Sequence, residues 1–406
     1  MSPWFSAAAS GPALAARHGL GPGGQAWLTG AVQLGFVAGT LVAAVLNLAD
    51  LVPSRWYFGV SALLAAAANL VILAAPDMAV LVGARAATGF FLAGVYPPAM
   101  KMAATWFRAR RGMAIGTVVG ALTVGKAAPF LLFRGEAAEG LAGTWGVVAA
   151  TLAAVVGGGL ILLSWRDGPH AFPRRPFQWG LVGEVVRHRP TRLATWGYLG
   201  HMWELYAMWS AVAVFLAAHR VARVPAGLAV GPEAAAVGVV AFFVIASGGL
   251  GAVGAGMLAD RLGRERVASW AMLISGAVAL TVGWLVGAPS WVVVPLLLVW
   301  GISVVADSAQ FSALVTEVVP GHAAGTALTL QTSLGFALTS VSIWLVPVVA
   351  EAAGWGWAFA LLAPGPVAGI LAMRALARER AREQLRHSTG DSSGSVTGDS
   401  TRGDRR

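Results

Sequence analysis

The feature that most constrains this chain is a series of apolar runs, each about as long as the ~20 residues that an α-helix needs to cross a bilayer. After a shorter run over residues 1–17, longer runs follow at 26–49, 56–75, 79–106, 113–134, 144–165, 193–217, 234–258, 267–286, 290–314, 323–349 and 354–374. Unpaired backbone groups are too costly in hydrocarbon, so such runs must be helices. They predict an all-α polytopic membrane protein.

The composition indicates the same class. Only 11% of the 406 residues are charged and 57% are hydrophobic, whereas a soluble domain carries roughly 25% charged residues. So few charges cannot cover a water-facing surface, and lipid is the expected solvent. The chain has no cysteine, which excludes disulfides and thiolate metal sites, and we expect no cofactor or metal.

The arginines predict the orientation in the membrane. On one side lie Arg108, Arg110, Arg111, Arg166, Arg174, Arg175, Arg187, Arg189, Arg192, Arg261, Arg264, Arg266, Arg374, Arg378, Arg380, Arg382 and Arg386. The other side has Arg17, Arg134, Arg220 and Arg223. The positive-inside bias therefore predicts that both termini lie in the cytoplasm. The expected location is the inner membrane of the cell. Because the arginines are scattered over short loops, the net charge of +10 indicates topology and not a nucleic-acid surface.

The runs form two groups of six. Residues 1–165 form the first, 166–192 a basic linker, 193–374 the second, and 375–406 a cytoplasmic tail that is low in complexity from Ser388 and expected to be partly disordered. The first run, with Pro3 and Pro12 inside it, is shorter than the ~20 residues of a span. We expect a first helix that is short and partly formed, or one that is truncated by a mis-assigned start.

The two groups also resemble each other in sequence. "GTLVAAVLNLADLVPSR" (39–55) parallels "GLGAVGAGMLADRLGRER" (249–266), and "GTVVGALTVGKAAP" (116–129) parallels "GTALTLQTSLGFALTSVSIWLVP" (325–347). Internal repeats of this kind are typical of transporters, whose binding site lies near the membrane midplane between the repeats.

Several motifs resemble those of the major facilitator superfamily. "GMLADRLGRERV" (256–267) is similar to its signature loop Gly-x-x-x-Asp-Arg-x-Gly-Arg-Arg, with Glu265 in place of one arginine, and the first-half copy has Leu51 and Pro53 where the loop has arginine and glycine. "RAATGFFLAG" (85–94) and "WFRARRGMAIG" (106–116) are similar to its fourth and fifth helices. The whole chain looks like bacterial nitrate- or cyanate-type permeases, although it lacks the arginines that nitrate members carry in helices two and eight.

The resemblance implies a twelve-helix (6+6) fold with pseudo-twofold halves that transports by alternating access. Helices one, four, seven and ten would line the cavity, and three, six, nine and twelve would face lipid. The resemblance also implies that the loop at Asp260, Arg261, Gly263 and Arg264 is a gate that latches the halves shut on the inside.

Two enzyme-like motifs are rejected. "GALTVGKA" (120–127) matches a phosphate loop through its lysine, but Ala127 stands where a magnesium-binding Ser or Thr is required. "GLGAVG" (249–254) matches a dinucleotide fingerprint inside an apolar helix without the strand–turn–helix context. Its glycines are better explained by close helix packing. A polytopic membrane enzyme is the rival class, and the chain contains no His-Glu-x-x-His or Gly-x-Ser-x-Gly motif that would favour it.

Charges away from the ends of the runs are the candidate site residues, because a charge at the bilayer centre costs at least ~2.5–3.5 kcal/mol and usually has a function. They are Arg85, Lys126, His201, Glu204 and Asp307, all on helices that the superfamily fold would allow to face the cavity. His201, Glu204 and Met208 follow an i, i+3, i+7 stripe, and Gln310 shares a face with Asp307. Tyr206 and Trp209 lie off this stripe, which favours packing over binding.

The hypothesis that follows is a secondary transporter. The cations Arg85 and Lys126 belong to the first half and the acids Glu204 and Asp307 to the second, which suits a small anion or zwitterion carried with protons by a monomeric symporter. Glu204, helped by His201 and with Asp307 as second acid, is the predicted titrating group. An uncoupled facilitator and an efflux exporter are the alternatives.

Overall fold

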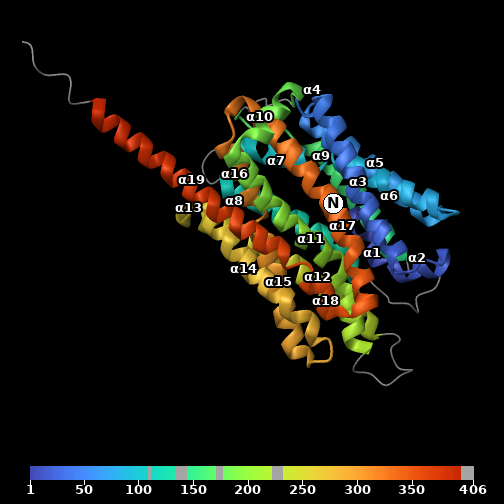
Figure 1. The fold of residues 1–406 in the computed structure, drawn as a ribbon. Helices are drawn as coiled ribbons and strands as arrows, with labels where there is room; N and C mark the ends of the chain where they lie inside the picture. Colours follow the sequence, from blue (N-terminus) through green and yellow to red (C-terminus); the bar gives the residue numbers. More distant parts are fainter. Residues whose placement is uncertain (108–110, 133–143, 171–176, 222–231, 395–406) are drawn as a thin grey trace, which may run out of the picture.

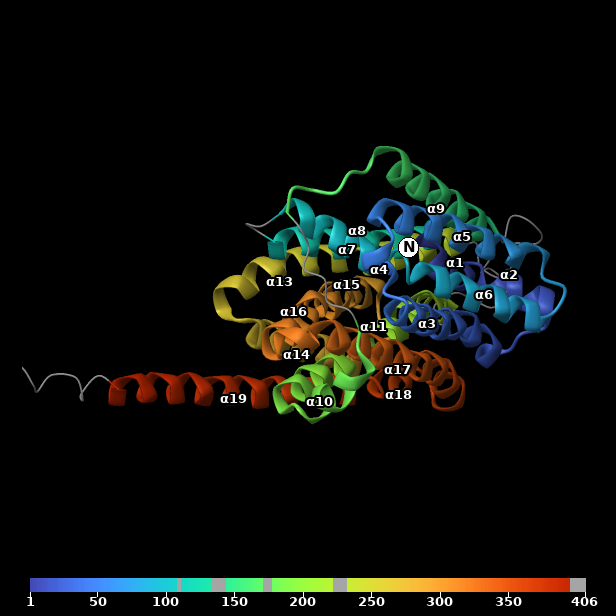
Figure 2. The same cartoon turned by 90° about the horizontal axis from the view of Figure 1, so that it is seen from above.

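The computed structural model describes residues 1–107, 111–132, 144–170, 177–221 and 232–394, and within these ranges all regular structure is helical. Long helices pack side by side (Figure 1), and one of them, at the C-terminal end, extends beyond the others (Figures 1 and 2). The basic residues Arg108, Arg110, Arg134, Arg174, Arg175 and Arg223, which the orientation argument uses, lie outside the described residues, as does the tail from residue 395 onwards.

The helices before the linker are called the N-terminal helices. They are η1 (Ser2–Trp4), α1 (Ser6–Ala9), α2 (Gly11–His18), α3 (Pro22–Val45), α4 (Leu48–Leu51), α5 (Ser54–Ala74), α6 (Met78–Leu92), α7 (Tyr96–Trp106), α8 (Arg111–Ala127), η2 (Ala128–Leu132) and α9 (Trp145–Ser164). The linker contains η4 (Trp179–Leu181) and α10 (Val182–Arg187).

The C-terminal helices follow the linker. They are α11 (Arg189–Val221), α12 (Pro232–Ala246), α13 (Gly248–Leu262), α14 (Arg264–Val282), η5 (Gly283–Leu285), α15 (Ser290–Ala306), α16 (Ser308–Val318), η6 (Gly321–Ala323), α17 (Ala324–Ala353), α18 (Trp355–Ala360) and α19 (Pro364–Gly394). The first seven residues of the predicted disordered tail, 388–394, belong to α19.

Nine helices of the described chain are long and apolar enough to cross a membrane, and a shorter apolar helix covers Gly116–Leu132. Large apolar side chains such as Leu163, Leu250 and Trp291 are more than two thirds exposed, as lipid-facing residues would be. The protein is therefore a multi-pass helical membrane protein. The count of twelve spans stays a prediction, because the first segment and α11 are not among these ten helices.

The first segment is broken rather than continuous. It consists of the 3₁₀ turn η1 and the short helices α1 and α2, with Pro3 and Pro12 each in the first turn of an element. Ser2, Trp4 and Phe5 are nevertheless buried, and the chain starts within the bundle (Figure 1). The expectation of a thin, partly formed first helix matches this geometry.

Glycines allow very close helix contacts on both sides of the linker. A Cβ at Gly35 in α3 would lie 1.9 Å from the carbonyl oxygen of Ala86 in α6. In the same way, a Cβ at Gly251 in α13 would lie 2.0 Å from the carbonyl oxygen of Ile302 in α15. Only glycine permits such backbone approach. The "GLGAVG" run is thus a packing element, as the sequence indicates.

The N-terminal and C-terminal helices meet at several places, where α8 and η2 contact α12, α8 contacts α13, and α3 contacts α17, and two of these contacts frame the site. Helix α3 packs along α17, where the Ser340 hydroxyl donates to the Gly30 carbonyl at 3.4 Å. Helix α8 packs along α13, where a Cβ at Gly120 would lie 3.3 Å from the Gly249 carbonyl oxygen. Figures 1 and 2 show both pairs side by side. The η1 turn, the end of α8 and the middle of α11 meet between them.

Candidate functional site

Lys126, in the last turn of α8, is a cation enclosed by aromatic rings. It is 1% exposed. Its ammonium donates a hydrogen bond to the Tyr206 hydroxyl and lies 4.0 Å, 4.4 Å and 5.3 Å from the ring centroids of Trp4, Tyr206 and Trp209. In the part of the chain that the structure describes, no carboxylate pairs with it. The ring faces partly compensate its charge through cation–π attraction, on the order of 0.5–2 kcal/mol each.

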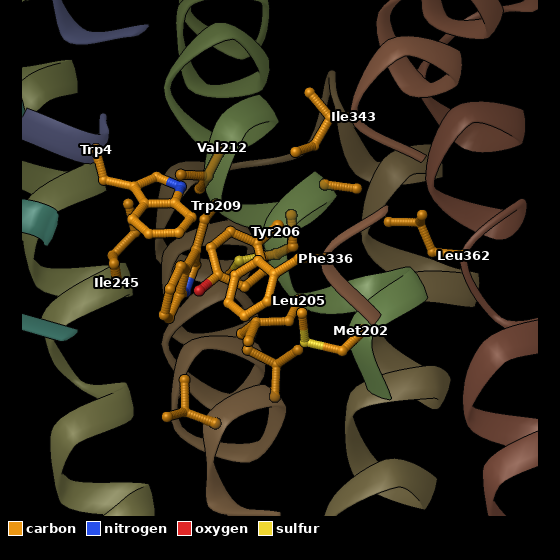
Figure 3. Close-up of a cluster of buried hydrophobic side chains, with 14 of the residues drawn as sticks. Trp4, Met202, Leu205, Tyr206, Trp209, Val212, Ile245, Phe336, Ile343 and Leu362 are labelled. Carbon is orange, nitrogen blue, oxygen red and sulfur yellow. The ribbon is translucent and has the colours of Figure 1, made fainter. Parts of the chain in front are cut away.

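The rings around Lys126 belong to a larger aromatic cluster. We define the aromatic cluster as Trp4, Phe5, Phe36, Tyr206, Trp209 and Phe336, all buried. Trp4, Tyr206, Trp209 and Phe336 lie close together in Figure 3, with ring centroids between 5.3 and 5.6 Å apart for the pairs Trp4–Tyr206, Trp4–Phe336, Tyr206–Trp209 and Tyr206–Phe336. Because its members come from the first segment, α3, α11 and α17, the cluster spans the junction of the N-terminal and C-terminal helices.

Several polar atoms of the helices that form this junction have no partner among the described residues. The donors are the indole Nε1 atoms of Trp4 and Trp209 and the Nε2 atoms of Gln33 and Gln331, and the acceptor is Oε1 of Gln33, all in buried residues. An indole N–H can only donate, and a buried donor without an acceptor is costly, by about 1–3 kcal/mol. A cation beside two unpaired indole donors is an arrangement suited to a ligand that carries acceptors and negative charge.

Glu204 lies on the opposite side of α11 from Tyr206. Its carboxylate accepts from the Ser275 hydroxyl of α14 at 2.8 Å and from the Trp300 indole of α15 at 2.6 Å, and its side chain is 1% exposed. The acid is therefore buried among C-terminal helices. Its contacts tie α11 to α14 and α15.

His201 and Asp307 form a second polar pair on the α11 side that faces α15 and α16. Their Nδ1 and Oδ1 atoms are 2.8 Å apart, and both side chains are 2% exposed. The other ring nitrogen of His201 lies 2.9 Å from the Ser308 hydroxyl. Asp307 occupies the break between α15 and α16. The predicted association of His201 with an acid is thus present, and its partner is Asp307 and not Glu204.

Arg85 in α6 is wholly buried and contacts neutral acceptors only, among the described residues. Its Nε donates to the Leu28 carbonyl at 2.9 Å, Nη2 donates to the Trp4 carbonyl at 2.5 Å, and Nη1 donates to the Pro3 carbonyl at 2.9 Å and to Asn69 Oδ1 at 3.0 Å. The guanidinium therefore holds the broken first segment, and through its backbone Trp4, in place.

The predicted gating loop lies at the far end of α13. Gly263 has φ +90°, a conformation that favours glycine, and Arg261 is exposed. Arg264 donates to Glu317 at 2.7 Å and to the Gln310 side chain at 3.0 Å, whereas Asp260 lies 3.9 Å from Arg264. Arg380 of α19 pairs with Glu265 and Glu317. Gln310, predicted to act beside Asp307, instead contacts this loop.

The structure thus distributes the predicted substrate and coupling residues over five places. Lys126 lies at the junction, and His201 and Asp307 form one pair. Glu204 stands apart, Arg85 supports the first segment, and Gln310 contacts the gating loop. Sequence reasoning missed Trp4, Tyr206 and Trp209. The signal for the last two was their own i, i+3 spacing on α11, which places them on one face beside each other.

The comparisons agree with a membrane transporter fold of this kind. The Major Facilitator Superfamily description matches residues 2–338, and a search of curated proteins finds no match. The bundle of apolar helices and this match together define a membrane transporter. The chain belongs to the major facilitator superfamily. Members of a transporter family act on small molecules in a bilayer, which is consistent with a non-enzyme.

Proposed function

We propose that this protein is a secondary transporter that moves a small anion by alternating access of two six-helix halves. The observation that carries the proposal is Lys126, a buried cation at the junction of the N-terminal and C-terminal helices with no carboxylate partner among the described residues. An isolated buried charge is expensive, and a bound anion would compensate it. The unpaired indole donors of Trp4 and Trp209 favour an anion over a zwitterion, whose ammonium would need acceptors.

We propose further that transport is coupled to protons through the acids of the C-terminal half. Buried ionisable groups in transporters commonly form proton relays, and Glu204, His201 and Asp307 are buried on or against α11. Helix α11 also carries Tyr206, which contacts Lys126. An anion that takes over Lys126 would release Tyr206, and the resulting shift of α11 would alter the contacts of Glu204 and Asp307.

We propose that the transporter works as a monomer in an inner membrane with both termini in the cytoplasm, as the arginine distribution predicts. It has no part in nucleic-acid binding. We propose import by symport, in which an inward proton gradient drives the anion and the proton in the same direction. The alternatives to proton-coupled import are export of the substrate and uncoupled facilitation, in which the substrate moves only down its own gradient.

Proteoliposomes containing the purified chain test this function. An inward proton gradient should drive accumulation of a labelled small anion, and collapse of that gradient with a protonophore should abolish it. If the anion only equilibrates across the membrane, and its uptake does not depend on the proton gradient, the protein is an uncoupled facilitator. Absence of both uptake and exchange across a panel of small organic and inorganic anions would reject the anion assignment.

A further inference from the structure

The linker contains a helical segment that the proposed function does not use. We call residues 177–192 the linker segment, which consists of η4, α10 and the first turn of α11. We infer that this segment binds the membrane surface, with an apolar face in the interfacial layer and its arginines on the headgroups of anionic phospholipids. Four observations carry the inference: the docking of the segment, its exposed face, its charge and its place in the bundle.

One face of the linker segment is fixed to the C-terminal helices. The backbone N–H of Gln178 donates to the hydroxyl of Thr326 in α17 at 2.9 Å, and Thr326 is buried. The carboxylate of Glu184 lies 3.1 Å from the His322 ring. Val185 of α10 is buried as well. The segment is therefore held in one orientation, and its opposite face is presented to the surroundings.

The opposite face is apolar and is not covered by any part of the chain that the structure describes. Trp179 is 68% exposed and Val186 is 54% exposed. Gly180 and Gly183, between them, are also exposed and add no polar side chain. Large apolar side chains are unfavourable in water, whereas tryptophan is enriched at the boundary between membrane and water. This face is therefore suited to the interfacial layer of a bilayer.

The charge of the linker segment complements an anionic surface. Arg187, Arg189 and Arg192 are exposed, and Glu184 is the only acid of the segment. Arg189 lies 3.3 Å from Glu379 of α19. Arg187 and Arg192 have no ion pair among the described residues. Since the predicted cytoplasmic leaflet carries anionic lipids, these arginines match its headgroups.

The linker segment also lies where a membrane surface is expected. Figure 1 shows α10 at one end of the bundle, and Figure 2, seen from above, shows it at the edge of the bundle, beside α19. In α11, which follows, Trp196 is 59% exposed, as a lipid-facing residue would be. Trp196 lies seven residues after Arg189, about 10 Å along the helix axis. The segment is therefore within reach of the polar layer, which is roughly 5–8 Å thick on each side of the hydrocarbon.

The experiment places a probe on the exposed face of the full-length protein. Because the chain has no cysteine, Val186→Cys provides a single attachment site for a fluorophore. The labelled protein is reconstituted in nanodiscs whose phosphatidylcholine carries brominated acyl chains, which quench a fluorophore that enters the interface. We expect quenching that increases as phosphatidylglycerol is added and decreases at high salt, which screens exposed charges.

A second label serves as the control for position. Gln384→Cys lies at an exposed position of α19, ten residues beyond residue 374, where the last predicted span ends. Ten helical residues extend about 15 Å, so this label should lie outside the interfacial layer. We expect it to remain unquenched in every nanodisc.

Variants separate the two parts of the contact. Arg187→Gln with Arg192→Gln should raise the phosphatidylglycerol content needed for half-maximal quenching at least about twofold, because each arginine strengthens attraction to an anionic surface. Arg378→Gln with Arg382→Gln, at exposed arginines of α19, removes the same charge and should leave that content unchanged. Size-exclusion chromatography verifies that each variant folds.

The outcomes decide the inference independently of transport. If the Val186 label is not quenched in any nanodisc, the exposed face lies away from the membrane and the inference is wrong. Quenching that does not depend on phosphatidylglycerol, or that responds equally to the two arginine pairs, would overturn the binding of anionic headgroups by this segment. The proposed anion transport does not depend on these results, since uptake in proteoliposomes tests it separately.

Discussion

Arg85 shows how a buried charge in a membrane protein can have a role in architecture. Replacement by glutamine would leave the carbonyls of Pro3, Trp4 and Leu28 with at most two donors among them, and each unsatisfied group costs about 1–3 kcal/mol. We therefore predict that Arg85→Gln lowers the unfolding temperature markedly in detergent. Arg55→Gln, at an exposed arginine, is the control and should leave it unchanged. Normal stability of the Arg85 variant with lost anion binding would instead indicate a direct contact with substrate.

Glu204 is the residue for which proton coupling is most directly testable. In the Glu204→Gln variant the amide oxygen can still accept from the Trp300 indole, and the NH2 group can donate to the Ser275 hydroxyl. The variant has lost the ability to gain or lose a proton. We predict that exchange of labelled for unlabelled substrate survives, while accumulation driven by a pH gradient is lost. Glu351→Gln, at an exposed acid of α17, should retain both activities. If the Glu204 variant still accumulates substrate with unchanged pH dependence, Glu204 is a structural residue.

The sequence identified which residues are unusual but not which way they face. A charged residue inside an apolar run is costly to insert into a membrane and usually has a function. Lys126, Glu204 and Asp307 could therefore be found from the sequence alone. Helix α11 has two polar faces, however, and the sequence cannot say which one meets the N-terminal helices. Tyr206 and Trp209 were assigned to packing for this reason. Trp4 was missed because its segment is too short to be judged by periodicity.

At the scale of elements, α13 depends on glycine along one face and not along another. A Cβ at Gly251 would lie 2.0 Å from the Ile302 carbonyl oxygen, whereas one at Gly254, three residues later, would meet nothing within 4 Å. We predict that Gly251→Ala displaces α13 from α15 and lowers both the yield and the unfolding temperature. Gly254→Ala should be neutral or slightly stabilising, because alanine favours helix by about 0.8–1.0 kcal/mol. Equal behaviour of the two variants would contradict the packing.

The loop between α13 and α14 is a second element with a testable role. We predict that Asp260→Asn lowers the turnover of transport and leaves expression intact, because the exposed acid contributes to a gate and little to the stability of the fold. Since Arg264 lies closer to Glu317 than to Asp260, Glu317→Gln should lower turnover more. Asp167→Asn, an exposed acid of the linker, serves as control. Unaltered turnover in both the Asp260 and the Glu317 variants would remove the gate role.

Apolar runs predicted the long helices because the ~20-residue requirement of a bilayer is a strong constraint. The interruptions were less predictable. Helices α15 and α16 are separated at Asp307, and α12 and α13 at Ser247, although neither site contains proline. Such breaks depend on tertiary contacts, such as that of Asp307 with His201, which a single sequence does not reveal.

For the whole molecule, the sequence repeats predict two similar halves, and this stays a prediction. Close glycine contacts occur in both groups of helices, between α3 and α6 and between α13 and α15. The relative placement of the two groups could not be predicted, because it depends on which helix faces meet. The junction of α8 with α13 places Gly120 and Gly249 backbone to backbone. If the halves rock as rigid bodies, this contact must change during each cycle.

A cross-link across the junction tests that motion. The chain has no cysteine, so Gly120→Cys with Gly249→Cys introduces a single possible disulfide. A Cβ at either position would lie 3.4 Å from the other Cα, close enough for the Cβ separation of about 3.5–4.5 Å that a disulfide requires. We predict that oxidation stops substrate exchange in proteoliposomes and that reduction restores it. Ala9→Cys with Gly146→Cys joins α1 to α9 within the N-terminal helices, where a Cβ at position 146 would lie 3.5 Å from that of Ala9. This control disulfide should not affect exchange, because α1 and α9 would move together. Exchange that continues in the fully cross-linked Gly120–Gly249 pair would exclude rigid-body rocking about the α8–α13 contact.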